Sequence, residues 1–126
     1  MTTDEVWTED EHLRGKPEWA VALYRDVAEA IAACGPVTLA VSKSMITFKG
    51  PRRGFAGARP TPTGVRGYLD LTRQLEADPR ILSASPYTRR LFVHQFRLTG
   101  PDDLDDTFRS WLCEGYAVGR GDHLRD

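Results

Sequence analysis

The chain has 126 residues, which is enough for one domain with a hydrophobic core and too few for two separate cores. Apolar and aromatic residues make up 40% of it and charged residues 28%, an ordinary globular composition that argues against disordered or collagen-like chains. The formal net charge is −1, from 17 basic and 18 acidic residues, and this excludes a globally basic nucleic-acid binder.

The N-terminal sequence has no feature of a secretory signal, because it begins Met-Thr-Thr-Asp-Glu, without a basic or an apolar run. The longest weakly polar stretch is far shorter than the roughly 20 residues that a membrane-spanning helix needs. Cys34 and Cys113 belong to no CxxC unit. We therefore expect a cytoplasmic protein that contacts no membrane and keeps both cysteines as reduced thiols.

The first part of the chain predicts an acidic leader followed by a helix. Residues 1–15 are rich in acidic side chains, and we expect this leader to be partly flexible. A helix is predicted from about Pro17 to Cys34, and Gly35 with Pro36 ends it. Apolar residues recur at every fourth position, so these are expected to be buried: Trp19, Leu23, Val27 and Ile31.

Short apolar runs separated by glycine and proline follow, and they predict antiparallel strands in a meander. The runs are Val37–Val41, Met45–Phe48, Phe55–Pro60 and Val65–Leu71. Strand alternation in the fourth run places Leu69 on the buried face and Tyr68 on the other face. Residues 72–88 are predicted to be an irregular loop with one helical turn at Leu75–Asp78.

The last part of the chain predicts one more strand and a final helix. The strand runs from Arg90 to Leu98, and alternation places His94 on its core face. The helix is predicted from Thr99 to about Val118, opened by a capping pair of Thr99 and Asp102. Its inward face is expected to carry the larger apolar side chains: Leu104, Phe108, Trp111 and Leu112.

This order of elements predicts an α+β fold. We expect a two-layer sandwich, in which an antiparallel sheet of about five strands carries the N-terminal and C-terminal helices on one face. Residues 16–118 would form this single domain, and residues 119–126 a C-terminal tail.

The order of several short motifs resembles that of a known family. These motifs are His12-x-x-Gly-Lys-Pro-Glu, Gly35-Pro36, Lys43-x-x-Ile-x-Phe, Phe55-Ala56, His94-x-Phe-x-Leu-Thr and the run from Asp103 to Leu112. Together, from about His12 to Tyr116, they resemble the bacterial domain-of-unknown-function family 5655. The sequence departs from that family's pattern at Leu13 and Phe92. The resemblance implies no particular activity.

His94 is the residue that most suggests chemistry. One interpretation is a buried neutral histidine bonded to a single partner, and the other is a catalytic acid–base or a ligand contact in a pocket. The spacing of the histidines and cysteines matches no metal-site motif, and no cofactor is indicated. Whether the protein is an enzyme is left open.

The charges are distributed unevenly along the chain. The segment from residue 43 to residue 66 has no acidic residue, and its basic residues are Lys43, Lys49, Arg52, Arg53, Arg59 and Arg66. One interpretation is a solvated sheet face with cations that guard the edge strands. The other is a binding site for an anion.

We therefore predict that the domain binds a small anionic ligand in a pocket between the sheet and the helices. His94 would anchor the ligand, with help from His12, Lys43 and Arg59. One alternative is a small enzyme with His94 as general acid–base. Another is an interaction module that uses the basic sheet face for a protein or, as the less favoured partner, a nucleic acid. Both a monomer and a homodimer, with Val6 and Trp7 at the subunit contact, fit the sequence.

Overall fold

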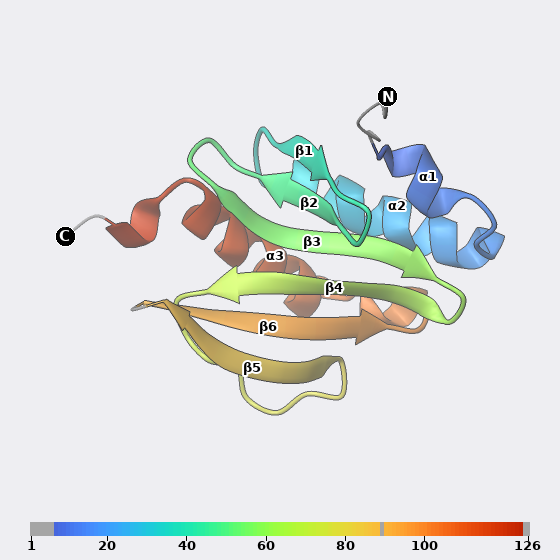
Figure 1. Cartoon of the computed structure of the whole chain (residues 1–126). Helices are drawn as coiled ribbons and strands as arrows, with labels where there is room; N and C mark the ends of the chain where they lie inside the picture. Colours follow the sequence, from blue (N-terminus) through green and yellow to red (C-terminus); the bar gives the residue numbers. More distant parts are fainter. Residues whose placement is uncertain (1–6, 89, 125–126) are drawn as a thin grey trace, which may run out of the picture.

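The computed structural model describes residues 7–88 and 90–124, which form helices packed against one face of a sheet (Figure 1). The helices are α1 (Glu9–Leu13), α2 (Glu18–Ala32) and α3 (Asp106–Gly119), with short 3₁₀ segments η1 (Pro101–Asp103) and η2 (Asp122–Leu124). The strands are β1 (Thr38–Val41), β2 (Ile46–Lys49), β3 (Gly54–Thr61), β4 (Gly64–Leu71), β5 (Ile81–Thr88) and β6 (Leu91–Leu98). Of the predicted leader, residues 1–6 lie outside the described residues, and so does Val6 as a subunit contact.

All neighbouring strands of the sheet are antiparallel, in the order β1-β2-β3-β4-β6-β5. The predicted meander is confirmed as β1 to β4, after which β6 pairs with β4 and β5 forms the outer edge. Helices α2 and α3 cover the face that lies away from the viewer in Figure 1. The predicted α+β class and the packing of helices on one face are confirmed, with six strands in place of about five.

The extra strand is β5, in a segment for which the sequence predicted an irregular loop. Residues 75–78 form no helical turn, so that prediction is wrong as well. Strand β5 lacks the alternation of apolar and polar residues, because most of its side chains are exposed at the sheet edge. Proline is tolerated at an edge, and Pro86 pairs with Phe92 beside an irregularity in the register.

Helix α2 confirms the predicted N-terminal helix and buries Leu23, Tyr24, Val27 and Ile31. Trp19 was expected to be buried with them, but 46% of it is exposed. A repeat of four residues drifts by about 40° per step around a helix with 3.6 residues per turn. Three steps separate Trp19 from Ile31, so Trp19 lies beyond the buried stripe at the first turn.

The start of the last helix also differs from the prediction. Thr99 pairs with Asp103, not Asp102, through its backbone N–H at 2.8 Å and its hydroxyl at 3.1 Å. The N-cap of α3 is Asp105, whose carboxylate accepts the N–H of Phe108 at 2.8 Å. The predicted inward residues of this helix region are buried: Leu104, Phe108, Trp111 and Leu112.

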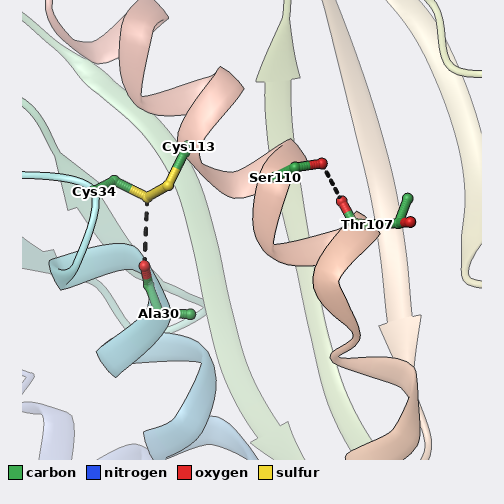
Figure 2. Close-up of a disulfide and its surroundings, with 5 residues drawn as sticks. All are labelled: Ala30, Cys34, Thr107, Ser110 and Cys113. Atoms are coloured by element: carbon green, nitrogen blue, oxygen red, sulfur yellow. Dashed lines mark hydrogen bonds between the residues drawn. A yellow bond between two sulfur atoms is a disulfide. The ribbon is translucent and has the colours of Figure 1, made fainter.

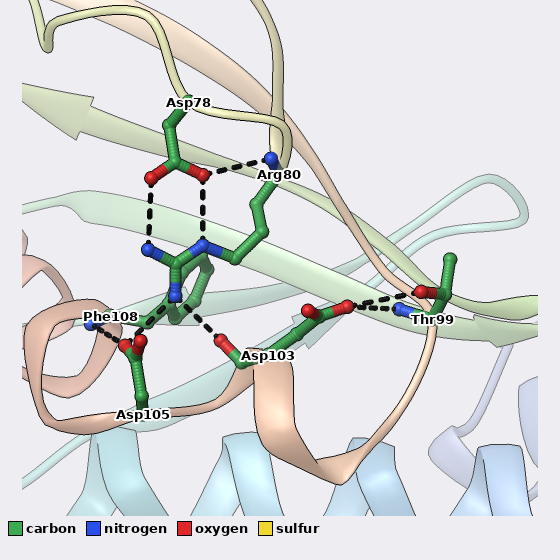
Figure 3. A network of polar contacts seen from close by, with 6 residues as sticks. All are labelled: Asp78, Arg80, Thr99, Asp103, Asp105 and Phe108. Atoms are coloured by element: carbon green, nitrogen blue, oxygen red, sulfur yellow. Dashed lines mark hydrogen bonds and ion pairs between the residues drawn. The ribbon is translucent and has the colours of Figure 1, made fainter.

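Arg80 connects the loop before β5 to the start of α3 (Figure 3). Its guanidinium donates twice to Asp78, at 2.9 and 3.0 Å, and once at 2.8 Å each to the Asp105 carboxylate and the Asp103 carbonyl. The same group lies 4.9 Å from the ring centre of Trp111. This network holds the irregular segment in one conformation and covers the end of the core.

A disulfide joins Cys34, just after α2, to Cys113 in α3 (Figure 2). The expectation of reduced thiols is therefore wrong for this structure. The two Cα atoms lie 5.2 Å apart, within the range for a disulfide, because both helices pack on the same face of the sheet. A sequence separation of 79 residues gave no sign of this proximity.

Among the described helices, none combines the length and the apolar character that a membrane crossing requires.

Candidate functional site

His94, the leading candidate from the sequence, lies in β6 and is fully buried. The backbone N–H of Leu75 donates to its Nε2 at 3.0 Å, and its Nδ1 lies 3.3 Å from the carbonyl oxygen of Leu69. Because Nε2 accepts a hydrogen bond, the ring proton is on Nδ1 and is donated to Leu69. Burial lowers the pKa of His94, so the imidazole is neutral at pH 7.

These bonds make His94 a link between strands β4 and β6 and the segment that leads into β5. A neutral ring whose two nitrogens are both bonded to the backbone offers no charge to an anion. His94 also does not line either of the two surface pockets described below. The structure therefore does not bring His94 together with the other predicted ligand-binding residues.

The other predicted residues, His12, Lys43 and Arg59, do come together. They line one pocket of about 350 Å³ between α1, the turn after β1 and strand β3. We call it the basic pocket, and its remaining lining residues are Trp7, Glu11, Lys16 and Ser44. Chain segments that are far apart in the sequence thus form one concave surface.

The short helix α1 occupies a place where the sheet has a gap. Strand β2 begins at Ile46, opposite Ala58, so β3 has no β2 partner beyond that point. His12 in α1 is buried there, with Nε2 2.7 Å from the carbonyl oxygen of Ser42. Since a carbonyl only accepts, Nε2 is the donor, and the bond fixes the turn that carries Lys43.

The basic pocket has an excess of positive charge. Lys16, Lys43 and Arg59 contribute cations, and Glu11 is the only acidic side chain among its described lining residues. Glu11 already forms an ion pair with Arg14 at 3.4 Å. The Nε atom of Arg59 is buried and has no hydrogen-bond partner within residues 7–88 and 90–124. A buried donor without a partner is costly, and an anion would satisfy it.

A second pocket, of about 610 Å³, lies on the sheet face opposite α2 and α3. We call it the open-face pocket. Its side chains combine two aromatic rings with polar and charged groups: Arg53, Tyr68, Asp70, Tyr87, Thr88, Val93 and Gln95. Tyr87 is 58% exposed, and the guanidinium carbon of Arg53 lies 5.8 Å from the centre of its ring.

Asp70 belongs to the open face by strand alternation and is nevertheless only 3% exposed. Arg53 covers it and donates to its carboxylate at 2.8 Å, while also donating to the carbonyl oxygen of Gly54 at 2.9 Å. Burial raises the pKa of Asp70 to about 6 although the nearby Arg53 cation lowers it, so the desolvation of the carboxylate outweighs the ion pair.

Sequence reasoning missed several of these residues. Lys16 follows the predicted leader, and nothing in the sequence showed that the leader folds back on the sheet. The partnership of Arg53 with Asp70 depends on the pairing of β3 with β4. Tyr87 lies in the strand that was predicted to be a loop. Within the described residues, no group of three or more histidine, cysteine or acidic side chains is arranged to hold a metal ion.

A family model described as "Domain of unknown function (DUF5655)" matches residues 9–119. A search of curated proteins found no significant match, and neither did a search of solved structures.

Proposed function

The chain belongs to the DUF5655 family of domains of unknown function, and from its own side chains we propose that it binds a small anion in the basic pocket. The ligand would carry a phosphate or a carboxylate group. The observation that carries this proposal is the unpartnered, buried Nε of Arg59, beside Lys16 and Lys43 in the same pocket.

The charges around the pocket support an anion over a neutral ligand. Three cations face one carboxylate, and that carboxylate is shared with Arg14. A guanidinium and two ammonium groups are the donors that proteins use for phosphate and carboxylate groups. A volume of about 350 Å³ lies at the small end of the range for ligand pockets, so the ligand would be small.

The roles of the side chains differ in this proposal. Arg59 and Lys43 would donate directly to the anion, and Lys16 would contribute charge while its ammonium donates to the His12 carbonyl at 3.3 Å. His12 would act as a positioning residue, because its Nε2 is used to hold the Ser42 carbonyl. His94, which the sequence suggested as the anchor, has no part in this proposal.

The proposal is tested by titrating the purified protein with inorganic phosphate and with acetate, by calorimetry or by amide chemical shifts. We expect saturable binding of one of them, with a dissociation constant of about 1 mM or tighter. The variant Lys43→Ala should weaken the binding about tenfold or more, because a charge-assisted hydrogen bond is lost.

The matched control is Lys49→Ala, which removes an exposed lysine from the same hairpin, outside the basic pocket. This variant should bind the anion as the unchanged protein does. Equal weakening by both variants would contradict the proposal, because it would indicate a general effect of charge. The absence of saturable binding of both anions would contradict it too.

A catalytic role for His94 stays a hypothesis. Both of its ring nitrogens bond to the backbone, so acid–base catalysis would require the Leu75 N–H to be released first. A cytoplasmic location also stays a prediction. The disulfide is typical of oxidising compartments, so thiol labelling of Cys34 and Cys113 in freshly lysed cells is the test.

A further inference from the structure

The open face of the sheet carries a row of three arginines that follows from the strand register. Arg59 in β3 is the direct partner of Arg66 in β4, and Arg66 is the direct partner of Arg97 in β6. Neighbouring strands lie about 4.8 Å apart, so the row crosses the sheet over about 10 Å. Like charges placed directly opposite each other repel, and none of these arginines forms an ion pair with another described residue.

The arginine row is adjacent to the open-face pocket. Tyr68 and Gln95 line that pocket and lie two residues from Arg66 and Arg97 in the same strands. Residues two apart in a strand point to the same face, about 7 Å from each other. The face therefore presents aromatic rings and an amide in a hollow, with cations beside it.

We propose that this face binds single-stranded nucleic acid, with a base held in the open-face pocket and the neighbouring phosphates on Arg66 and Arg97. The exposed Tyr87 would stack with a base, the half-buried Tyr68, which packs over Gly57, would line the hollow beside it, and Gln95 offers a donor and an acceptor for the edge of the base. The guanidinium groups match phosphate oxygens in a bidentate geometry. The proposal does not rest on anion binding in the basic pocket, since neither Arg66 nor Arg97 lines that pocket.

The shape of the face favours a single strand over a duplex and over an acidic protein. A base in a duplex is stacked between its neighbours, and a broad sheet does not enter a groove to reach it. An acidic protein would satisfy the arginines and make no use of the exposed Tyr87 ring in the open-face pocket. The local charge of this face is positive although the net charge of the chain is −1, because Arg66 and Arg97 have no acidic partner within the described part of the chain and Asp70, the one acidic side chain among the described lining residues of the open-face pocket, is already paired with Arg53.

The test uses fluorescein-labelled oligo-U and oligo-dT of about 12 nucleotides, with fluorescence anisotropy as the readout at several salt concentrations. We expect binding at low salt that weakens as salt rises. The double variant Arg66→Ala/Arg97→Ala should weaken binding and reduce the slope of log K against log salt by about 1.4, the value for two lost phosphate contacts. Tyr87→Ala should weaken binding about tenfold.

The matched control for charge is Arg25→Ala/Arg109→Ala, which removes two exposed arginines from helices α2 and α3. This control should bind as the unchanged protein does. All variants are first checked for folding by circular dichroism. We expect them to fold, because Tyr87 is exposed and because loss of Arg66 and Arg97 removes repulsion within the arginine row.

Several results would overturn the proposal. One is the absence of binding to both oligonucleotides at low salt, and another is equal binding by the two double variants. If inorganic polyphosphate competes equally well and Tyr87→Ala has no effect, the face binds polyanions without reading bases. If uridine monophosphate binds as tightly as oligo-U, the site is one for a free nucleotide. If no nucleic acid binds and an acidic protein is captured through Arg66 and Arg97, the arginine row is a protein-binding surface.

Discussion

The disulfide between Cys34 and Cys113 is expected to supply a large share of the stability of this domain. It closes a loop of 79 residues, which restricts the unfolded chain strongly. The chain-entropy relation for such a loop gives about 15 cal/mol/K, or about 4.5 kcal/mol at 25 °C. Domains of this size have a free energy of unfolding of about 5 to 15 kcal/mol. Reduction of the disulfide is therefore expected to remove from about a third to nearly all of the free energy of unfolding.

The measurement is urea unfolding, followed by circular dichroism, of the oxidised protein, of the protein reduced with a thiol agent and of the variant Cys34→Ser/Cys113→Ser. The reduced protein and the variant should both unfold at much lower urea than the oxidised protein. The same reducing agent added to the variant is the control, and it should change nothing. A loss below about 1 kcal/mol in the reduced protein would refute the reasoning, since loop closure would then not govern the unfolded state.

Four further predictions concern buried or largely buried polar groups. Burial raises the pKa of Asp70 to about 6 from 3.8, so the native state binds the proton more tightly. The contribution of Asp70 thus makes stability fall as the pH rises from about 4 to about 6, and Asp70→Asn should remove this fall in urea midpoints measured across that range. Arg53→Ala should lower the free energy of unfolding at pH 7 by about 2 kcal/mol, because it leaves a buried carboxylate without its counterion. His94→Ala should lower the free energy of unfolding by about 2 to 4 kcal/mol, because the buried N–H of Leu75 loses its acceptor and a cavity remains. Arg80→Ala should lower the free energy of unfolding by about 2 kcal/mol, because the bidentate pair with Asp78 is lost. Arg80→Lys should restore little of this stability, because an ammonium group cannot replace the bidentate guanidinium.

Specific outcomes would contradict the predictions for Asp70, His94 and Arg80. An unchanged pH profile in Asp70→Asn would show that this carboxyl titrates in the folded protein as it does in water. A loss below about 0.5 kcal/mol in His94→Ala would show that water satisfies the Leu75 N–H and that the histidine is not needed there. Full recovery in Arg80→Lys would show that charge alone holds the loop before β5 to α3.

The pH dependence of His94 is opposite in sign to that of Asp70. Burial lowers the pKa of His94, so its contribution to stability is present above about pH 6.5 and is lost as the pH falls through the folded-state pKa. The two groups therefore offset each other in mildly acidic solution. Comparison of Asp70→Asn with the unchanged protein separates them, because the variant keeps only the loss on acidification.

Local sequence patterns determined most of the secondary structure. Apolar periodicity located α2 and α3, and short runs bounded by glycine and proline located β1 to β4 and β6, since these signals depend only on near neighbours. The exceptions have local causes too. Strand β5 is an exposed edge strand without alternation, and Trp19 falls outside the buried stripe because four residues exceed one helical turn.

The sequence by itself also grouped His12, Lys43 and Arg59 and placed His94 on the core face of its strand, but it did not decide what the His94 ring contacts. Whether a histidine on a core face lines a pocket or bonds to the backbone depends on which segment covers it, and here that segment is the loop at Leu75. Tertiary structure alone decided the disulfide, the cover of Arg53 over Asp70 and the arginine row across three strands. Each of these joins residues that are distant in the chain, and their proximity follows from strand register and helix packing, which no local pattern encodes.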